Sequence, residues 1–414
     1  MTELKDLYKV IDDSAKTYTD LMGSLVAIPS LSPDYGGVGE YDRVEFLEGY
    51  LRQRKTFDEI ERVDFPDDRA KNGVRPNLMA HRKCRGANKT LWLISHSDTV
   101  PPGDLAQWSS NPYILSEDGG RLYGRGTEDG LQGICSTLAA CEGVHSLGLN
   151  IDLNVSLMIL ADEETGNGYG LKKLMSERAG LFSPNDLVIV ANGGNRRGDR
   201  IEVAEKSILW LRFRIEGRGC QASMPHLGVN SFRAGAHLIV SLEDLKRDFA
   251  TENELFEPPY STFEPTLQEY KPSGINAIPE ENVFYYDCRI LPSLSLKRVK
   301  ERIAEICSSV EKEHSVKVSF EVENEVEATE STQPSADVVA RAAEAIESVY
   351  RVRAQARGIG WVTPAALIRR AGVPAIVYSK IEETAHLPDE YCVLENLLGD
   401  AKVFATIMGR RGEG

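Results

Sequence analysis

The sequence predicts an α/β protein with a mainly parallel sheet, interrupted by a smaller inserted α+β domain. Apolar, strand-like runs alternate with helix-like segments between residues 91 and 191, a pattern typical of parallel sheets. Near residue 206 the pattern changes to strands of alternating polar and apolar residues, and the first pattern returns after Pro334. A chain of 414 residues is long enough for two domains. We therefore expect one domain of residues 1–205 and 324–414 and an inserted domain of residues 206–323.

The larger domain should begin with helices and continue with buried strands. Apolar side chains recur at helical spacing in residues 16–28 and 39–54, and a long connecting segment follows up to about residue 90. Short apolar runs predict strands at residues 91–95, 153–161, 187–191 and 375–378. Further helices are expected at residues 131–145, from Pro334 to Tyr350, and from Leu394 onward.

The inserted domain should contain a small antiparallel sheet. Alternating side chains predict strands at residues 208–216, 282–290 and 316–322. Amphipathic helices are expected at residues 232–246 and 296–312. The order strand, helix, strand, helix, strand fits a ferredoxin-like α+β domain with an open sheet.

The composition excludes several classes of protein. Asp and Glu number 63 against 48 Lys and Arg, a formal charge of −15, so nucleic acid and anionic membranes are poor partners. No segment reaches the ~20 apolar residues of a membrane-spanning helix. The seven cysteines include no Cys-x-x-Cys pair, and the first residues lack the pattern of a signal peptide. These features indicate a cytoplasmic protein with reduced thiols.

Polar clusters stand at the ends of three predicted strands. They are His96-Ser97-Asp98, Asp162-Glu163-Glu164 and Asn192-Gly193-Gly194-Asn195. In open α/β sheets, ligands bind beyond the carboxyl ends of the strands, so these clusters point to one site. His96 and Asp98 face the same way, so the carboxylate can hydrogen-bond one imidazole nitrogen while the other binds a metal. Taken alone, the pair could also be a solvated loop histidine beside a turn aspartate.

The segment Gly124-Arg125-Gly126-Thr127-Glu128-Asp129-Gly130 looks superficially like a dinucleotide-binding loop. Asp129, however, takes the place of the third glycine, and a carboxylate there repels a pyrophosphate, which excludes the nucleotide hypothesis. Asp129 is either a metal ligand beside a glycine-rich loop or an acidic residue at a helix N-terminus.

Glu163 and Glu164 are adjacent carboxylates, which repel one another unless a cation is near. One can bind a metal while the other takes a proton from metal-bound water; the alternative is a pair of exposed turn glutamates. His386 lies in a loop after the strand at residues 375–378. The remaining histidines without such neighbours are expected to be ordinary surface or core residues; they are His81, His145, His237 and His314.

Taken together, these motifs resemble the zinc-dependent exopeptidase and deacylase family. Its members include acetylornithine deacetylase, succinyl-diaminopimelate desuccinylase, glutamate carboxypeptidase and the aminoacylases. The resemblance spans nearly the whole chain, and the ordered set is specific although each motif is weak alone. The matching motifs are residues 96–101, residues 124–129, Glu163-Glu164, and Ala385-His386 with Glu390-Tyr391.

The resemblance implies a catalytic zinc-binding domain with an inserted lid that carries the interface of a homodimer. His96 would bind one zinc, Asp129 would bridge two, and Glu164 and His386 would bind the other. Asp98 would orient His96, and Glu163 would be the general base. One or two Zn²⁺ per chain are implied, with Co²⁺ or Mn²⁺ as alternatives. The implied substrate-binding residues are Gln221, Asn276, Arg289 and Thr363; the alternative for Arg289 is an ion pair with Asp287.

Two residues depart from the family pattern. Asn192 stands at the position of a fifth, acidic metal ligand, and Gln221 replaces a lid histidine that stabilises the oxyanion in relatives. The leading hypothesis is a metal-dependent hydrolase that cleaves the amide bond of a small peptide or N-acyl amino acid with a free carboxylate. Carboxypeptidase, dipeptidase, deacetylase and desuccinylase activities all fit this description. The rival hypothesis is a catalytically impaired relative that binds such ligands, and a purely structural protein leaves the polar strand ends unexplained.

Overall fold

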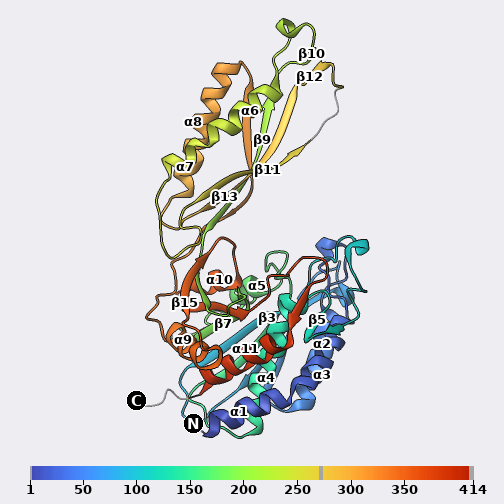
Figure 1. Cartoon of the computed structure of the whole chain (residues 1–414), viewed down its shortest axis with the longest axis vertical. Helices are drawn as coiled ribbons and strands as arrows, with labels where there is room; N and C mark the ends of the chain where they lie inside the picture. Colours follow the sequence, from blue (N-terminus) through green and yellow to red (C-terminus); the bar gives the residue numbers. More distant parts are fainter. Residues whose placement is uncertain (1, 270–273, 410–414) are drawn as a thin grey trace. The chain divides into compact units, whose positions relative to one another are not determined.

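The computed structural model describes residues 2–269 and 274–409. It confirms the predicted α/β class, with one large mixed sheet and a separate small antiparallel sheet (Figure 1). The chain forms two compact units. The larger unit comprises Met1–Val203, Thr332–Ala356 and Thr363–Gly414, and the smaller unit comprises Ala204–Ser331 and Arg357–Val362.

The large sheet has the strand order β1-β2-β6-β3-β7-β16-β8-β15. The strands are β1 (Glu59–Pro66), β2 (Val74–Arg82), β3 (Thr90–His96), β6 (Asn154–Leu160), β7 (Leu187–Asn195), β8 (Arg200–Glu205), β15 (Gln355–Ile359) and β16 (Ala375–Lys380). The central strands β6, β3, β7 and β16 run parallel, whereas β1, β2 and β8 have antiparallel neighbours. The predicted buried strands are therefore confirmed, and their carboxyl ends lie at one edge of the sheet.

The expected long connection before residue 90 is wrong, because β1 and β2 occupy it. β1 lies at the edge of the sheet and is mostly half-exposed, so its sequence shows charged residues rather than an apolar run. A second difference concerns Asn192, which lies inside β7 rather than after it. The polar end of β7 still pairs with β16, after a shift in register.

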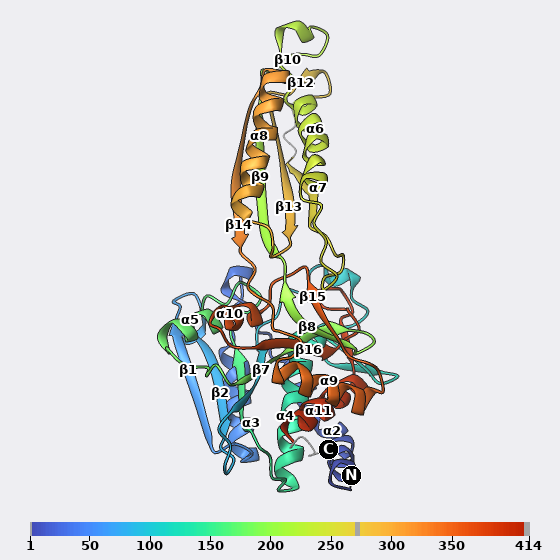
Figure 2. The same ribbon diagram turned by 90° about the vertical axis from the view of Figure 1, so that its left-hand side faces the viewer.

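Helices cover both faces of the large sheet. They are α1 (Thr2–Asp13), α2 (Ala15–Val26), α3 (Tyr41–Arg54), α4 (Gln132–Ser146), α5 (Leu171–Glu177), α9 (Asp337–Tyr350), α10 (Pro364–Arg370) and α11 (Leu394–Met408). Figure 2 shows α5 and α10 on one side of the sheet and α4, α9 and α11 on the other. Buried side chains of the sheet pack on α5 and α10 through residues such as Leu171, Leu174 and Ile368. Among the described helices, none combines the length and the hydropathy that a membrane span requires.

A second, three-stranded sheet joins two distant loops of the larger unit. It contains β4 (Ser116–Asp118), β5 (Arg121–Tyr123) and β17 (Tyr391–Val393), in the order β17-β5-β4. β5 and β17 are antiparallel, with Tyr123 opposite Tyr391. Because β5 leads directly into residues 124–131 and β17 directly follows residues 385–390, this pairing brings the two loops together.

The smaller unit is a four-stranded antiparallel sheet with helices on one face. Its strands are β9 (Ser207–Glu216), β11 (Thr262–Glu269), β13 (Glu281–Ile290) and β14 (Lys317–Val326), in the order β11-β13-β9-β14. Helices α6 (Ser231–Leu242), α7 (Asp244–Asp248) and α8 (Leu296–His314) pack on it around a core that includes Phe213, Leu238 and Ile303. The expected strands and helices are present. β11 was not expected, because this edge strand is exposed along most of its length.

Candidate metal centre

His96 is held at the end of β3 between two carboxyl residues. It is 1% exposed, and its Nε2 lies 2.9 Å from Oδ1 of Asp129. Its Nδ1 lies 3.1 Å from the backbone carbonyl of Asp98 and 3.5 Å from the Asp98 carboxylate. Burial alone lowers the pKa of His96, but the interactions with Asp129 and Asp98 outweigh it and leave this pKa well above its usual value. His96 is therefore fixed in orientation, with Nε2 directed at Asp129.

The Asp98 carboxylate has a second role, which concerns the neighbouring loop. Its two oxygens accept the backbone N–H groups of Glu163 and Glu164, at 3.1 and 3.0 Å. Asp98 thereby ties the end of β3 to the loop that follows β6. The main contact of Asp98 with His96 is made by its carbonyl oxygen.

Asp129 stands between the two histidines. Its Oδ1 faces His96, and its Oδ2 lies 2.8 Å from Nε2 of His386. Desolvation raises the pKa of Asp129, but the hydrogen bonds from His386 and His96 more than compensate and hold it below its usual value. An ionised carboxylate with one oxygen toward each imidazole has the geometry of a bridging ligand.

Gly130 makes this arrangement sterically possible. Its φ is +94°, and a Cβ built on it would lie 2.9 Å from Cε1 and from the carbonyl oxygen of His96. A side chain would push His96 away from Asp129 and strain the backbone. The close approach thus requires glycine after Asp129.

Glu164 completes the group of ligand-type atoms. Its Oε2 lies 3.3 Å from Nε2 of His386. Its Oε1 is buried and accepts no hydrogen bond from the residues described. One donor atom each from His96, Asp129 and Glu164 lies within 4.8 Å of the others. A cation at this position would bind the Glu164 oxygen that has no hydrogen-bond partner.

Glu163 is a carboxyl group whose pKa is raised to about 8. Desolvation is the largest cause, and the neighbouring charges of Glu164, Asp129 and Asp98 add to it, while His96 opposes it. A cation bound by the adjacent ligands would lower this pKa again. Glu163 is therefore a carboxyl group that binds a proton readily when no cation is near.

The loop of Glu163 and Glu164 is anchored by a buried ionic network. Asp162, with a left-handed φ of 61°, accepts the N–H of Tyr169 at 3.0 Å and lies 3.2 Å from Nη2 of Arg75. Nε of Arg75 in turn donates to Oε2 of Glu40 at 2.7 Å. Sequence analysis missed Arg75 and Glu40, because their partners lie far away along the chain.

Glu128 fixes the loop that carries His386. Its carboxylate accepts the backbone N–H groups of Glu382, Thr384 and Ala385, at 2.5, 2.5 and 3.0 Å. Burial raises the pKa of Glu128 to about 7. His386 itself has a left-handed φ of 66°, which costs about 1–2 kcal/mol for a non-glycine residue. The hydrogen bonds to Glu128 stabilise this strained loop.

Glu390 fixes the opposite loop in the same way. Its carboxylate accepts the N–H groups of Gly126, Glu128 and Asp129, each at 3.0 Å, and forms an ion pair with Arg125 at 2.5 Å. Each loop therefore contributes a glutamate whose carboxylate accepts hydrogen bonds from the backbone of the other loop. Asp129 and His386 are held together by this reciprocal pair. Both glutamates lie within motifs of the sequence, but those motifs do not indicate which backbone groups the carboxylates bind.

Asn192 lies among the ligand-type atoms but presents an amide. Its Oδ1 accepts the N–H of Gly130 at 2.9 Å. Its Nδ2 donates to Oδ1 of Asp129 at 2.9 Å and lies 3.0 Å from Nε2 of His96. In this orientation the amide oxygen is engaged by the backbone, and the side of Asn192 that faces the site is a donor.

The set of nitrogen and oxygen donors fits a divalent metal. Imidazole and carboxylate together suit Zn²⁺, Co²⁺ and Mn²⁺. His96, Asp129, Glu164 and His386 would hold it, and the unpartnered Oε1 of Glu164 supports this fit. All of the residues predicted to bind or serve the metal are thus brought together in the larger unit, with Asp98 and Glu163 beside them.

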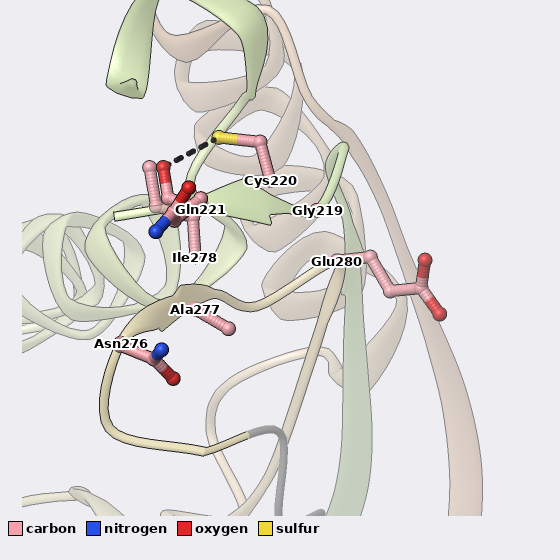
Figure 3. A pocket seen from close by; sticks show the side chains of 7 residues that line it. All are labelled: Gly219, Cys220, Gln221, Asn276, Ala277, Ile278 and Glu280. Carbon is pink, nitrogen blue, oxygen red and sulfur yellow. Dashed lines mark hydrogen bonds between the residues drawn. The ribbon is translucent and has the colours of Figure 1, made fainter. Parts of the chain in front are cut away.

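The predicted substrate-binding residues belong to both units. Gln221 in β10 (Cys220–Gln221) and Asn276, next to β12 (Ala277–Ile278), lie in the smaller unit and line one pocket (Figure 3). Arg289, also in the smaller unit, forms the ion pair with Asp287 that the sequence left open, at 2.7 Å, and donates to the carbonyl of Gly360 at 3.0 Å. Thr363 lies in the larger unit, directly before α10.

The sequence and the fold are similar to those of known proteins. The family model for peptidase family M20/M25/M40 matches residues 92–410 of the sequence. An uncharacterized metallohydrolase of Methanocaldococcus jannaschii is 34% identical, over 96% of this chain and 99% of that protein. A succinyl-diaminopimelate desuccinylase of Bradyrhizobium is 27% identical, over 93% of this chain and 97% of that protein. Among solved structures, the dipeptidase Dug1p of Saccharomyces cerevisiae has a TM-score of 0.75 at 17% identity, covering 99% of this chain and 98% of that chain.

Proposed function

The chain belongs to peptidase family M20/M25/M40 and is a metal-dependent amidohydrolase, and we propose that it uses zinc to cleave a small peptide or N-acyl amino acid that bears a free carboxylate. One observation carries the proposal. The Asp129 carboxylate is shared between His96 and His386, with an unsatisfied oxygen of Glu164 beside it. Histidine and carboxylate ligands are those of the catalytic zinc sites of hydrolases, and Glu163 lies beside them as a candidate proton acceptor.

Glu163 is proposed as the general base. A divalent metal, when bound, acidifies a water molecule and polarises the amide carbonyl. Glu163 then takes the proton of the attacking water and passes it to the leaving amine. Asp98 holds the backbone of Glu163 and Glu164 at fixed positions, so proton transfer and ligation fall to adjacent residues.

Two relatives suggest the class of substrate. A succinyl-diaminopimelate desuccinylase removes an acyl group from an amino acid, and Dug1p is a dipeptidase. Both names describe amide bonds next to amino acids, so the substrate here is proposed to be an N-acyl amino acid or a short peptide. Gln221, Asn276, Arg289 and Thr363 are proposed to contact it.

The second candidate function is binding of such ligands with little turnover. It rests on Asn192, whose amide donor faces the ligand atoms, and on Gln221, which cannot become cationic. The intact arrangement of Glu163, Asp129 and His386 favours the enzyme.

A homodimer through the smaller unit is also proposed. Helix α6 exposes Phe232 (55% exposed) and Val240 (70% exposed), which share one stripe with Ala236 at i, i+4 and i+8. β11 is an edge strand of the small sheet, and such edges need a partner or a cover. Light scattering at micromolar protein should give twice the chain mass, and a monomer would contradict the proposal.

The function is tested by a hydrolysis screen with N-acetyl and N-succinyl amino acids and dipeptides, with zinc, cobalt or manganese added. Glu163→Gln should abolish turnover and leave the metal content nearly unchanged, because it removes the base and keeps the ligands. Glu164→Gln should instead lose metal. If the effects on metal content are reversed, the roles of the two glutamates are exchanged; if no substrate is cleaved while ligands bind, the second candidate function replaces the first.

A further inference from the structure

A second group of metal-type donors lies on the smaller unit. His237 stands in the middle of α6, and Glu313 and His314 are the last two residues of α8. One donor atom from each residue lies within 4.8 Å of the other two. Helices α6 and α8 lie side by side on the same face of the small sheet, as both views show (Figures 1 and 2). The three residues therefore meet where these helices pack.

We propose that His237, Glu313 and His314 bind a divalent transition metal ion, zinc by preference, at a site that shares no residue with the centre around Asp129. Two imidazoles and one carboxylate form a donor set that zinc, nickel and copper bind well. The imidazole rings of His237 and His314 have centroids 4.5 Å apart at an interplanar angle of 45°, and Nε2 of His314 lies 3.8 Å from Oε1 of Glu313. Zinc binds nitrogen and oxygen ligands at about 2.0–2.2 Å, so small rotations of these side chains would bring the three donors onto one ion.

The state of His314 is an independent argument for a ligand. Its Nε2 is buried and has no hydrogen-bond partner among the described residues. Buried polar atoms are usually satisfied, so an imidazole nitrogen left without a partner needs an explanation. A metal bound to this nitrogen supplies the missing interaction.

The end of α8 adds a favourable electric field. His314 is the last residue of α8, and Ser315 follows it in a left-handed conformation, so the helix ends there. The carbonyl groups of a last helical turn carry partial negative charge, which attracts cations. The nearby ammonium of Lys317 lies 3.4 Å from the Glu216 carboxylate, so its charge is paired.

A metal at this site would join α6 to α8. His237 and Glu313 are exposed, so water can complete the coordination shell and no entry path has to open. Such an ion would stabilise the helical layer of the smaller unit and take no part in hydrolysis. The site escaped sequence analysis because His237 and His314 lie far apart in the chain and neither is part of a metal-binding motif.

The test is a count of bound zinc on the full-length protein, by equilibrium dialysis and elemental analysis. His237→Gln and His314→Gln should each bind one zinc fewer per chain than the unmodified protein. The matched control is His145→Gln, which changes an exposed histidine on α4 and should keep the full count. The test compares the zinc counts of the variants with that of the unmodified protein. Its outcome therefore does not depend on whether the centre around Asp129 binds metal or hydrolyses amides.

Two further measurements make the result decisive. The melting temperature should rise with zinc by several degrees less in the His237→Gln and His314→Gln proteins than in the control. Glu313→Gln alters an exposed side chain that no packing depends on, so it should fold normally and bind zinc more weakly. Equal zinc counts in all variants, or a loss of stability with no change in zinc count, would overturn the proposal.

Discussion

Asn192→Asp should make the metal-free protein less stable. Nδ2 of Asn192 donates to Oδ1 of Asp129 across 2.9 Å and lies 3.0 Å from His96. Loss of a hydrogen bond to a charged acceptor costs about 1.5–3 kcal/mol. Two carboxylates ~3 Å apart repel by about 5 kcal/mol at an effective dielectric constant of about 20, and protonated His96 beside both offsets most of this. We therefore expect the free energy of unfolding in EDTA to fall by about 2–3 kcal/mol.

Zinc should offset this loss of stability. The aspartate places an anionic oxygen beside His96 and Asp129, where the unmodified chain has an amide donor. A ligand at 100 times its dissociation constant stabilises the folded state by about 2.7 kcal/mol. At about 2–4 °C per kcal/mol, the zinc-dependent rise in melting temperature should be about 5–10 °C larger in Asn192→Asp than in the unmodified protein. The zinc count should rise towards one additional ion per chain.

Asn195→Asp is the matched control. Asn195 lies in the same strand, its Nδ2 donates to Oδ1 of Asp199 at 2.8 Å, and its Oδ1 accepts a backbone N–H. It repeats the chemistry of Asn192→Asp next to a carboxylate outside the proposed metal centre. Scanning calorimetry in EDTA and in zinc, with elemental analysis, should show destabilisation by both changes and a zinc gain by Asn192→Asp alone. Identical responses of the two variants to zinc would refute the reasoning.

The remaining predictions concern the groups around the proposed centre. Glu128→Gln should weaken zinc binding about 10–100-fold, as expected for loss of a group that orients a ligand, whereas Glu117→Gln at an exposed position should not; competition with a chelator measures both. Gln221→His should raise kcat more than it lowers KM, because it adds a donor able to carry positive charge. Steady-state kinetics on the best substrate of the screen measure both constants, and an unchanged kcat would contradict this prediction. In EDTA, the stability contributed by His386 should be fully present below about pH 6.5 and lost as pH rises through about 10, because its hydrogen bonds to Asp129 and Glu164 raise its pKa to about 10. The melting temperature should therefore depend less on pH across this range in His386→Gln than in the unmodified protein. The same dependence in both proteins would exclude His386 as its cause.

Much of the site could be predicted because it depends on local patterns. Apolar runs fixed the positions of β3, β6 and β7, and the carboxyl ends of neighbouring parallel strands meet at one edge, so His96, Glu163 and Asn192 had to be close. The edge strands β1 and β11 were missed because exposed strands need no apolar run. The identity of the metal ligands came from the resemblance to a family and stays a prediction.

The groups that hold the loops together could not be predicted. Glu128 and Glu390 bind backbone N–H groups, which every residue has, so their partners leave no trace in the sequence. The partner of Arg289 could not be predicted either. Its planar guanidinium group suits a substrate carboxylate and equally suits the carboxylate of Asp287, two residues away. The folded chain shows the contact of Arg289 with Asp287, and a contact of Arg289 with the substrate stays a proposal.

The charges of the centre explain why Asn192 should control the number of metal ions. The pKa of His96 is well above its usual value and that of His386 is about 10, so both imidazoles hold a proton in the metal-free protein at neutral pH. One divalent ion that displaces these two protons leaves the net charge of the site unchanged. A second ion adds two positive charges, and ionisation of Glu163 supplies only one compensating negative charge. A metal-bound hydroxide supplies part of this charge, and an aspartate at position 192, which carries a neutral amide here, would supply more. The unmodified chain should therefore bind the second ion more weakly than the Asn192→Asp protein does.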